Sequence, residues 1–227
     1  MSFAFYFLLG LLQPTQTVMG SWEITNGDDR KVLMIRDNYF SISHFNVTTK
    51  QFFHSFGGTF KYDGTKASIV IEFDTKNADN IGTKHEATFT SANDQLTFSV
   101  LGYGATWKQT DNGNAALAGN WRISGRLEGG NMNSIPKRDR KTLKLLTGNR
   151  FQWMAINPVS KEFFGTGGGT YTFVNGKYTE TIEFFSRDST RVGASLQFDG
   201  KVEGDNWYHS GKSSKGEDLN EVWSREK

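Results

Sequence analysis

The chain of 227 residues contains no cysteine and only three prolines. The lack of cysteine excludes a disulfide framework, a thiolate metal site and a cysteine nucleophile, although it does not indicate a cellular compartment. The scarcity of proline, together with an aromatic content of 14% that includes nineteen phenylalanines, favours β-structure over disorder.

An excess of charge of one sign is also missing. Lys and Arg number 26 against 24 Asp and Glu, which gives a formal net charge of +2. Nucleic-acid-binding proteins normally carry a clustered basic face, and the densest basic run here is the short segment 136–140, Pro-Lys-Arg-Asp-Arg. The sequence therefore predicts no nucleic-acid partner.

A hydrophobic run long enough to cross a bilayer is absent as well. Residues 3–12 carry no charge, but ten residues are too short for a stable membrane span. Their length suits the apolar region of a secretory signal peptide. We therefore expect residues 1–19 to be a signal peptide cleaved near Thr17, and the protein to be secreted or periplasmic. The alternative is that this segment forms a first strand or an apolar helix packed on the core.

Motifs for metal binding and catalysis are lacking too. The histidines are isolated in the sequence, and neither a His-x-His nor a His-Glu-x-x-His spacing occurs. No Gly-x-Ser-x-Gly elbow is present, and acidic loops such as residues 77–80 do not have the ligand spacing of a calcium site. We therefore predict no catalytic residue, no metal and no cofactor.

What the sequence does contain is an internal repeat. Residues 40–82 return at 151–193 without a gap, with thirteen of 43 positions identical. A fixed internal period indicates a repeated structural unit, and this length comfortably holds two domains of about 100 residues each. We predict domains at residues 20–112 and 119–227, with the boundary in the polar segment that begins at residue 111.

Each copy consists of short segments in which apolar and polar residues alternate, separated by turn formers. This period of two is typical of strands, and no window shows convincing helical periodicity. About eight short antiparallel strands hide their edges by closing into a barrel. The predicted fold class is therefore all-β, with two tandem lipocalin-like antiparallel β-barrels of about eight strands each. The expected strands are residues 22–25, 32–36, 39–45, 51–62, 67–74, 86–90, 95–101 and 106–109 in the first copy, and 141–146, 151–156, 162–173, 177–185, 195–198, 205–209 and 221–224 in the second.

Two local features add detail to this prediction. Glycines at 57–58 and 167–169 fall inside the longest expected strand, where they favour a bend or bulge. Residues 126–140 are an insertion peculiar to the second copy. A loop of this length is often a lid or rim, and disorder is the open alternative.

Each copy opens with Gly-x-Trp, at Trp22 and Trp121, and the second copy closes with Glu-Val-Trp-Ser-Arg ending at Arg225. With the Gly-Thr-Tyr, Asn-Gly-x-Tyr and Ile-Glu-Phe motifs of the second copy, the chain resembles tandem lipocalin-like (calycin) domains of secreted bacterial proteins of unassigned function. The resemblance implies that each Trp plugs the closed end of a barrel beneath a basic side chain. That side chain would be Arg225 over Trp121, and Lys108 over Trp22.

Aromatic residues provide the candidate site. Several persist as aromatics in both copies, whereas Trp153 and Tyr178 occur only in the second. They either pack in the core and between the barrels or line a ligand cavity, which is the usual form of a small-molecule site. The predicted ligand-binding residues are Trp153, Tyr171, Phe173, Tyr178, Glu183 and Phe151.

Glu183 is the most informative carboxylate, because it and Glu72 lie between Ile and Phe in both copies. Alternate residues of a strand face opposite sides. If Ile and Phe fill the barrel, Glu lies outside as a solvated or ion-paired group. The other possibility is that Glu lines a polar lumen while Ile and Phe pack against the sister barrel.

By analogy with the fold, the function we expect is an extracytoplasmic binding protein for a small apolar or amphipathic ligand held in a barrel. The first alternative is a structural or interaction module that binds a protein or a polysaccharide (glycan) through outer aromatic strands. The second is an enzyme, an isomerase or hydrolase, that uses Glu183 and a tyrosine.

Overall fold

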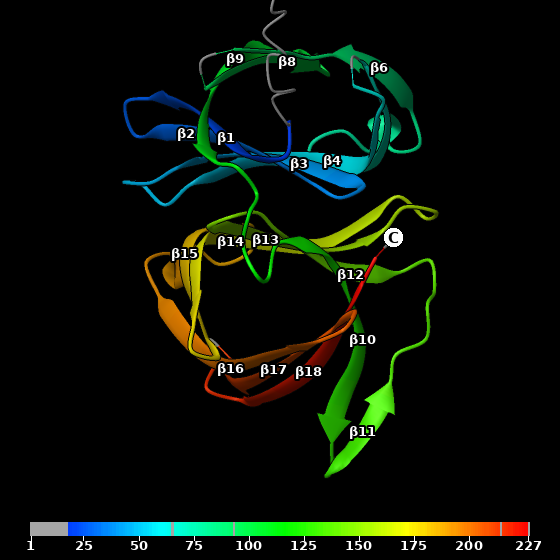
Figure 1. The fold of residues 1–227 in the computed structure, drawn as a ribbon, viewed down its shortest axis with the longest axis vertical. Helices are drawn as coiled ribbons and strands as arrows, with labels where there is room; N and C mark the ends of the chain where they lie inside the picture. Colours follow the sequence, from blue (N-terminus) through cyan, green and yellow to red (C-terminus); the bar gives the residue numbers. More distant parts are fainter. Residues whose placement is uncertain (1–17, 65, 93, 214, 227) are drawn as a thin grey trace, which may run out of the picture.

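The computed structural model describes residues 18–64, 66–92, 94–213 and 215–226. Figure 1 shows two antiparallel β-barrels in tandem, seen end on, which confirms the predicted fold class. The strand order of barrel 1 is β6-β5-β4-β3-β2-β1-β9-β8-β7. Its strands are β1 (Gly20–Asn26), β2 (Asp29–Arg36), β3 (Tyr39–Asn46), β4 (Phe52–Tyr62), β5 (Lys66–Asp74), β6 (Lys84–Thr88), β7 (Thr90–Ala92), β8 (Gln95–Val100) and β9 (Tyr103–Asp111).

Barrel 2 has the order β11-β10-β12-β13-β14-β15-β16-β17-β18, and an additional pairing of β10 with β18 closes it. Short 3-10 turns, η1 (Ala78–Asn80) and η2 (Ser189–Arg191), follow β5 and β15 at equivalent places in the two copies. The strands of barrel 2 are β10 (Gly119–Glu128), β11 (Asn131–Ser134), β12 (Lys141–Leu146), β13 (Arg150–Asn157), β14 (Glu162–Val174), β15 (Lys177–Phe185), β16 (Ser195–Glu203), β17 (Asn206–Lys212) and β18 (Asp218–Arg225).

The insertion at 126–140 contains regular structure that neither sequence interpretation included. β10 runs on to Glu128 and pairs with β11, which makes a hairpin that projects from barrel 2 (Figure 1). Gly129 and Gly130 form its turn with φ of 59° and 80°, a conformation that glycine adopts at little cost. The segment after β11 then returns along the barrel to β12.

Most of the predicted signal peptide, residues 1–17, lies outside the described residues. Val18 and Met19 are described, and both pack against the core of barrel 1. The Trp22 indole also donates a hydrogen bond of 3.0 Å to the Val18 carbonyl. These two residues are therefore part of barrel 1. No helix among the described residues is long and apolar enough to cross a membrane.

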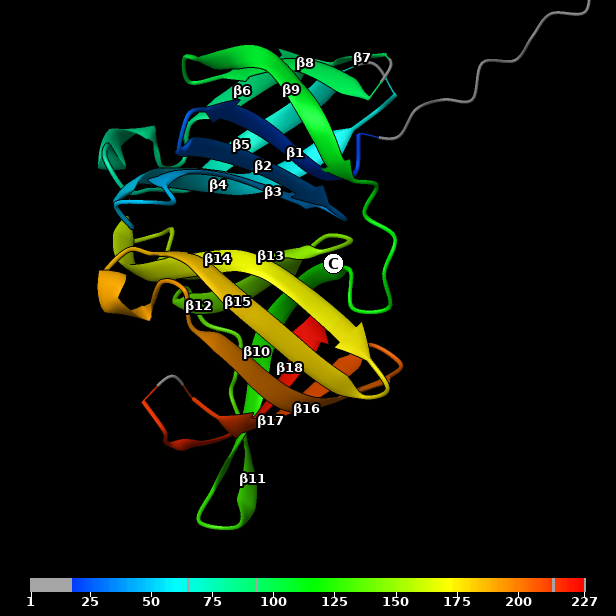
Figure 2. The same cartoon turned by 90° about the vertical axis from the view of Figure 1, so that its left-hand side faces the viewer.

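The two barrels pack together through side chains of equivalent strands, β2, β3 and β5 of one and β12, β13 and β15 of the other. Figure 2 shows the sheet around β3 and β4 facing the sheet around β13 and β14. Use of the same surface on both sides is the geometry of an isologous, two-fold interface. The apolar cluster between them, hereafter the inter-barrel cluster, contains Val32, Met34, Tyr39, Phe45 and Phe73 from barrel 1 and Leu143, Leu145, Met154, Ile156 and Phe184 from barrel 2.

A bulge in the long β14–β15 pairing decides which way the side chains of the repeated Ile-Glu-Phe motif point. The register shifts between Gly168 and Gly169, so that Gly168 pairs with Phe184 and Gly169 with Ile182, leaving Glu183 as the extra residue. A Cβ on Gly169 would lie 2.0 Å from the Thr181 carbonyl oxygen, which explains the glycine. The prediction of a bend here is confirmed.

Barrel 1 has the same bulge between Gly57 and Gly58. As a result, Ile71 lies in the core of barrel 1, whereas Phe73 lies in the inter-barrel cluster. The expectation that Ile and Phe of this motif share one face is therefore wrong, because the bulge inserts a residue into the alternation.

Candidate ligand-binding site in barrel 2

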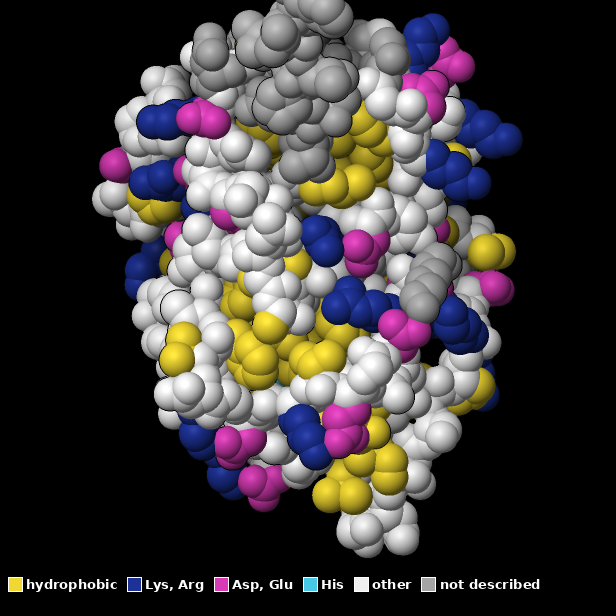
Figure 3. Space-filling view, viewed as in Figure 1, with side chains coloured by type: hydrophobic (Ala, Val, Ile, Leu, Met, Phe, Trp, Pro, Cys, Tyr) yellow, Lys and Arg dark blue, Asp and Glu magenta, His cyan; other side chains and the backbone are white. Residues whose placement is uncertain are grey.

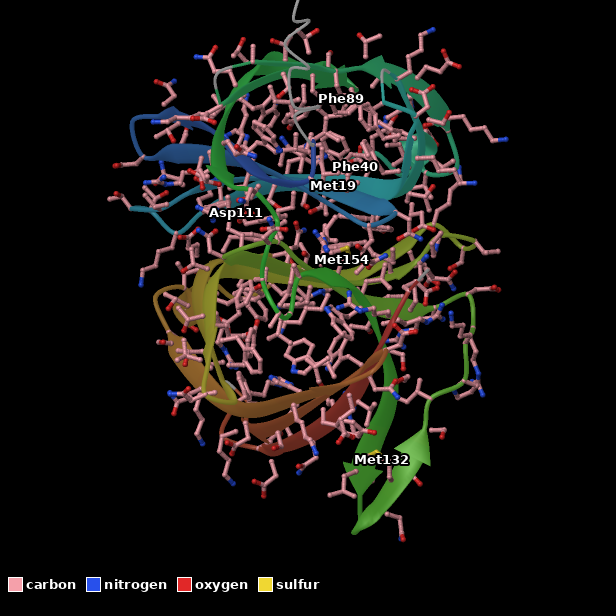
Figure 4. The ribbon with its side chains drawn as sticks, viewed as in Figure 1. Met19, Phe40, Phe89, Asp111, Met132 and Met154 are labelled. Atoms are coloured by element: carbon pink, nitrogen blue, oxygen red, sulfur yellow. The ribbon has the colours of Figure 1, made fainter. Side chains whose placement is uncertain are left out.

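The interior of barrel 1 is filled by apolar side chains. Phe89 stacks on Phe98 with ring centroids 4.5 Å apart, and Phe60 lies between Phe89 and Phe40 at 5.5 and 6.5 Å. Phe40 and Phe89 lie inside the ring of barrel 1 in Figure 4, whereas Met154 lies between the barrels. Barrel 1 therefore has the packed core of a structural domain.

A hydrogen-bonded group also fixes His54 within barrel 1. Its imidazole contacts the Tyr103 hydroxyl and the Asp74 carboxylate, each at 2.6 Å. Burial raises the pKa of Asp74, but hydrogen bonds from His54, Asn80 and two backbone amides outweigh it and lower the pKa to about 2. In barrel 2 the repeat places Gly165 and Phe185 where His54 and Asp74 stand, so this group is not reproduced there.

Barrel 2 instead carries ionisable groups at inner positions that are apolar in barrel 1. By the repeat offset, Lys144 corresponds to Leu33 and Glu180 to Ile69. The pairing partners agree, since Leu33 pairs with Ile42 and Lys144 with Trp153, which correspond by the same offset. Aligning the closing tryptophans likewise places His209 where barrel 1 has Phe98.

Lys144 and Glu180 form a buried ion pair. The Lys144 Nζ lies 2.8 Å from Glu180 Oε2, and the two side chains are 5% and 10% exposed. Tyr178 donates its hydroxyl to the same carboxylate oxygen at 2.9 Å. The ammonium also lies within 4.7–6.0 Å of four ring centroids, a favourable cation–π environment, formed by Tyr178, Phe151, Trp207 and Trp223.

His209 is the unusual member of this group. It is 4% exposed, and neither ring nitrogen has a hydrogen-bond partner among the described residues. The nearest carboxylate, Glu221, lies 3.8 Å from Nδ1, which is beyond hydrogen-bond distance. Burial lowers the pKa of His209, so the imidazole is neutral at physiological pH. Among the described residues, the ring nitrogens therefore lie in the barrel without a hydrogen-bond partner.

Lys144, Glu180 and His209 line a cavity of about 240 Å³. Its wall combines apolar and aromatic groups with a few polar ones, the usual composition of a small-molecule site. The principal lining residues are Lys144, Trp153, Glu180, Phe198, His209 and Trp223.

Of the predicted ligand-binding residues, Trp153 lines this cavity directly. Phe151 and Tyr178 are buried in the same aromatic cluster, and both rings contact Lys144. Tyr171 and Phe173 also belong to the cluster but do not line the cavity. The Tyr171 hydroxyl is already used, because it donates to the Thr147 carbonyl at 2.7 Å.

Glu183 does not lie in the lumen. As the bulge residue it faces outward, where Arg150 donates to its carboxylate at 2.7 Å and also contacts Glu23 of barrel 1. Its counterpart Glu72 makes a 2.8 Å ion pair with Lys141 across the same boundary. Glu183 therefore helps to join the barrels, which matches the ion-paired alternative raised from the sequence.

Sequence reasoning missed the lumen residues Lys144, Glu180, His209 and Glu221. The sequence interpretation judged ionisable residues by whether both copies carry them, whereas these four residues occupy positions at which the copies differ. A signal was available, because an alignment of the copies shows Leu33 and Ile69 replaced by residues of opposite charge. Such a paired exchange at inward positions indicates a buried ion pair.

The closed end of barrel 2 has the predicted arrangement. The Arg225 guanidinium lies 4.3 Å from the Trp121 ring centroid, and the indole donates to the Leu117 carbonyl at 2.8 Å. In barrel 1 the prediction for Lys108 is wrong. Gln109 pairs opposite Trp22, and the Lys108 side chain is exposed.

Among the described residues, no group of three or more His, Cys, Asp or Glu side chains is arranged to hold a metal ion. Comparison of the chain with protein-family models and with curated proteins finds no match.

Proposed function

We propose that barrel 2 binds a small amphipathic molecule in its lumen, and that the chain is an exported binding protein of the lipocalin-like (calycin) type. The observation that carries the proposal is His209, a buried imidazole that lines the cavity and whose ring nitrogens have no hydrogen-bond partner in the part of the chain that the structure describes. An unsatisfied buried polar group costs about 1–3 kcal/mol. A ligand that hydrogen bonds to His209 would remove this cost.

The contrast between the barrels supports the same assignment. Barrel 1 fills equivalent inner positions with Leu33, Ile69 and Phe98 and is a packed core. A barrel that served only as structure would gain nothing from the ion pair of barrel 2, because buried pairs are on average no more stabilising than packed apolar groups. The charged lumen is therefore best explained by binding.

The cavity also limits the size and the chemical character of the ligand. At about 240 Å³ it falls below the range of about 300–1,000 Å³ typical of small-molecule sites. Trp153, Phe198 and Trp223 offer ring faces, while His209 and the Lys144–Glu180 pair offer polar contacts. A single aromatic ring or a short apolar chain with one polar group fits this arrangement.

Native mass spectrometry of the protein purified from its own export pathway tests the proposal, followed by denaturing extraction of whatever was bound. We expect a small molecule that is released on unfolding. A clean apo mass, with no shift after incubation with a panel of lipids, pigments and aromatic acids, would contradict the binding function.

Proton transfer is a second candidate, and a specific observation favours it. A neutral imidazole at His209 can accept a proton from a molecule held in the same lumen and return it to another atom of that molecule. If barrel 2 catalyses such a step, the extracted molecule incubated with protein in deuterated water would gain deuterium at carbon. If the molecule stays unlabelled, proton transfer is contradicted and binding remains the proposed function.

The alternative function, binding of a protein or a polysaccharide through outer aromatic strands, requires exposed aromatic side chains. Phe45, Phe52 and Phe163 of the outer strands pack in or against the inter-barrel cluster. Among the described residues Tyr208, at 39%, is the one aromatic side chain classed as exposed. Within the described residues, the outer strands therefore give this alternative little exposed aromatic surface as support.

A further inference from the structure

A second concavity, hereafter the strap groove, lies beside the lumen of barrel 2. It forms because β10 pairs with β12 only as far as Arg122 and then follows β18 and β11 away from it. Residues 135–140 return across the resulting gap. The groove has a volume of about 610 Å³ and shares Thr142, Glu221 and Trp223 with the lumen cavity. The two spaces are therefore neighbours along one wall.

The lining of the strap groove is strongly basic. Five cationic side chains line it against two carboxylates, Glu128 and Glu221. Lys and Arg side chains are visible along this flank of barrel 2, on the side from which the hairpin projects (Figure 3). The cations are Arg122, Arg126, Arg138, Arg140 and Lys141.

Two of the five cations remain available to a ligand. Arg122, Arg126 and Lys141 pair with Glu226, Glu221 and Glu72 at 3.6, 2.8 and 2.8 Å. Within the described part of the chain, Arg138 and Arg140 form no ion pair with a carboxylate. The Arg140 guanidinium lies 4.1 Å over the Phe164 ring, which holds it in place.

We propose that the strap groove binds the anionic group, a carboxylate or a phosphate, of the molecule whose apolar part occupies the lumen of barrel 2. This inference rests on the proposed binding function. Arginine is suited to the role because its planar fork donates two parallel hydrogen bonds to a carboxylate or phosphate. Trp223, common to both spaces, would contact the junction between the two parts of the ligand.

The test is a titration followed by tryptophan fluorescence with four probes that share one apolar part: 4-phenylbutyrate, 4-phenylbutyl phosphate, 4-phenylbutanol and 4-phenylbutylamine. We expect one of the two anions to bind at least about tenfold more tightly than the alcohol, as a charge-assisted hydrogen bond allows, and the amine to bind most weakly. Whichever anion binds more tightly identifies the headgroup.

Variants then test whether the preference for an anion over the alcohol arises in the strap groove. Arg138→Gln/Arg140→Gln should weaken the preferred anion about tenfold and leave the alcohol unchanged. Lys61→Gln/Lys84→Gln, which removes two exposed charges from barrel 1, is the matched control and should change neither. Because Arg140 packs on Phe164, the single variant Arg138→Gln provides a version that leaves this contact intact.

The failures of the two proposals can be told apart. If the alcohol binds as tightly as both anions, or if the arginine variants lower neither anion's affinity, the anion site is refuted while binding in the lumen stands. If none of the four probes binds and no extracted molecule is found, the binding function falls and the anion site falls with it.

Discussion

Lys144 lies 2.8 Å from Glu180 inside barrel 2, where barrel 1 has Leu33 and Ile69. Because the chain carries both versions of one interior, it provides its own control for the contribution of this ion pair. Removing Lys144 alone would leave Glu180 charged and buried. We expect Lys144→Leu to cost about 3–5 kcal/mol in the free energy of unfolding, measured by urea denaturation.

The matched variant makes barrel 2 resemble barrel 1. Lys144→Leu/Glu180→Ile also needs Tyr178→Phe, because the Tyr178 hydroxyl would lose its acceptor. We expect this triple variant to be about as stable as the native protein, since buried ion pairs can be replaced by apolar groups at little cost. It should carry no bound molecule. A triple variant as unstable as Lys144→Leu would show that the pair itself stabilises the fold.

His209 gives the protein a pH dependence in its stability. Burial lowers the pKa of His209 in the folded state, whereas the unfolded chain binds the proton near pH 6.5. Between these values the unfolded state holds more protons, so the free energy of unfolding falls as the pH drops below about 6.5. We expect the melting temperature to decrease more between pH 7.5 and 5.5 in the native protein than in His209→Phe. Equal decreases in the two proteins would contradict the assignment.

Arg225 closes barrel 2 over Trp121 and donates to the Ala118 carbonyl at 3.1 Å. We expect Arg225→Gln to lower the free energy of unfolding by about 1–2 kcal/mol, from the lost cation–π contact and hydrogen bond. Arg225→Lys should recover part of the loss, because it keeps the charge without the planar group. The same stability for both variants would show that the positive charge alone contributes nothing and that the loss comes from the planar guanidinium. Native stability in both variants would contradict a role of Arg225 in closing the barrel.

Asp111 joins the two barrels at the linker (Figure 4). Its carboxylate accepts hydrogen bonds from Ser21 of barrel 1 and from Thr147 and Gly148 of barrel 2, at 2.7–2.8 Å. We expect Asp111→Asn to cost about 1–3 kcal/mol. Asp79→Asn, at an exposed position, is the control and should be neutral in thermal melts.

Acid should have the same effect as this substitution. Burial raises the pKa of Asp111, but hydrogen bonds from Ser21, Thr147 and backbone amides outweigh it and lower the pKa. A carboxyl with a depressed folded pKa stabilises above its unfolded pKa of about 3.9, and this stability is lost as the pH falls below that value. The stability difference between the native protein and Asp111→Asn should therefore shrink below about pH 4. A difference that persists there would refute the assignment.

Local sequence pattern was sufficient to predict the duplicated fold. Turn residues and alternation placed most strands within a few residues of their observed bounds, and the Gly168–Gly169 pair indicated the bulge that lets the sheet bend. The Trp121 and Arg225 closure also followed from sequence, through the family resemblance. These features depend on neighbours along the chain or on one pairing of strands.

Whether a side chain faced the lumen or the sister barrel was decided by the tertiary structure. Ile182 and Phe184 are two residues apart, yet the bulge sends one to the lumen cavity and the other to the inter-barrel cluster. Glu180 and Glu183 are glutamates on the same strand. Glu183 nevertheless pairs with Arg150 outside the barrel, whereas Glu180 pairs with Lys144 inside it. The alternation of apolar and polar residues divides a strand into two faces. When both faces are buried, it does not show which one faces the lumen and which one faces the sister barrel. The site arises from contacts between residues far apart in the chain, which form only when the barrel closes.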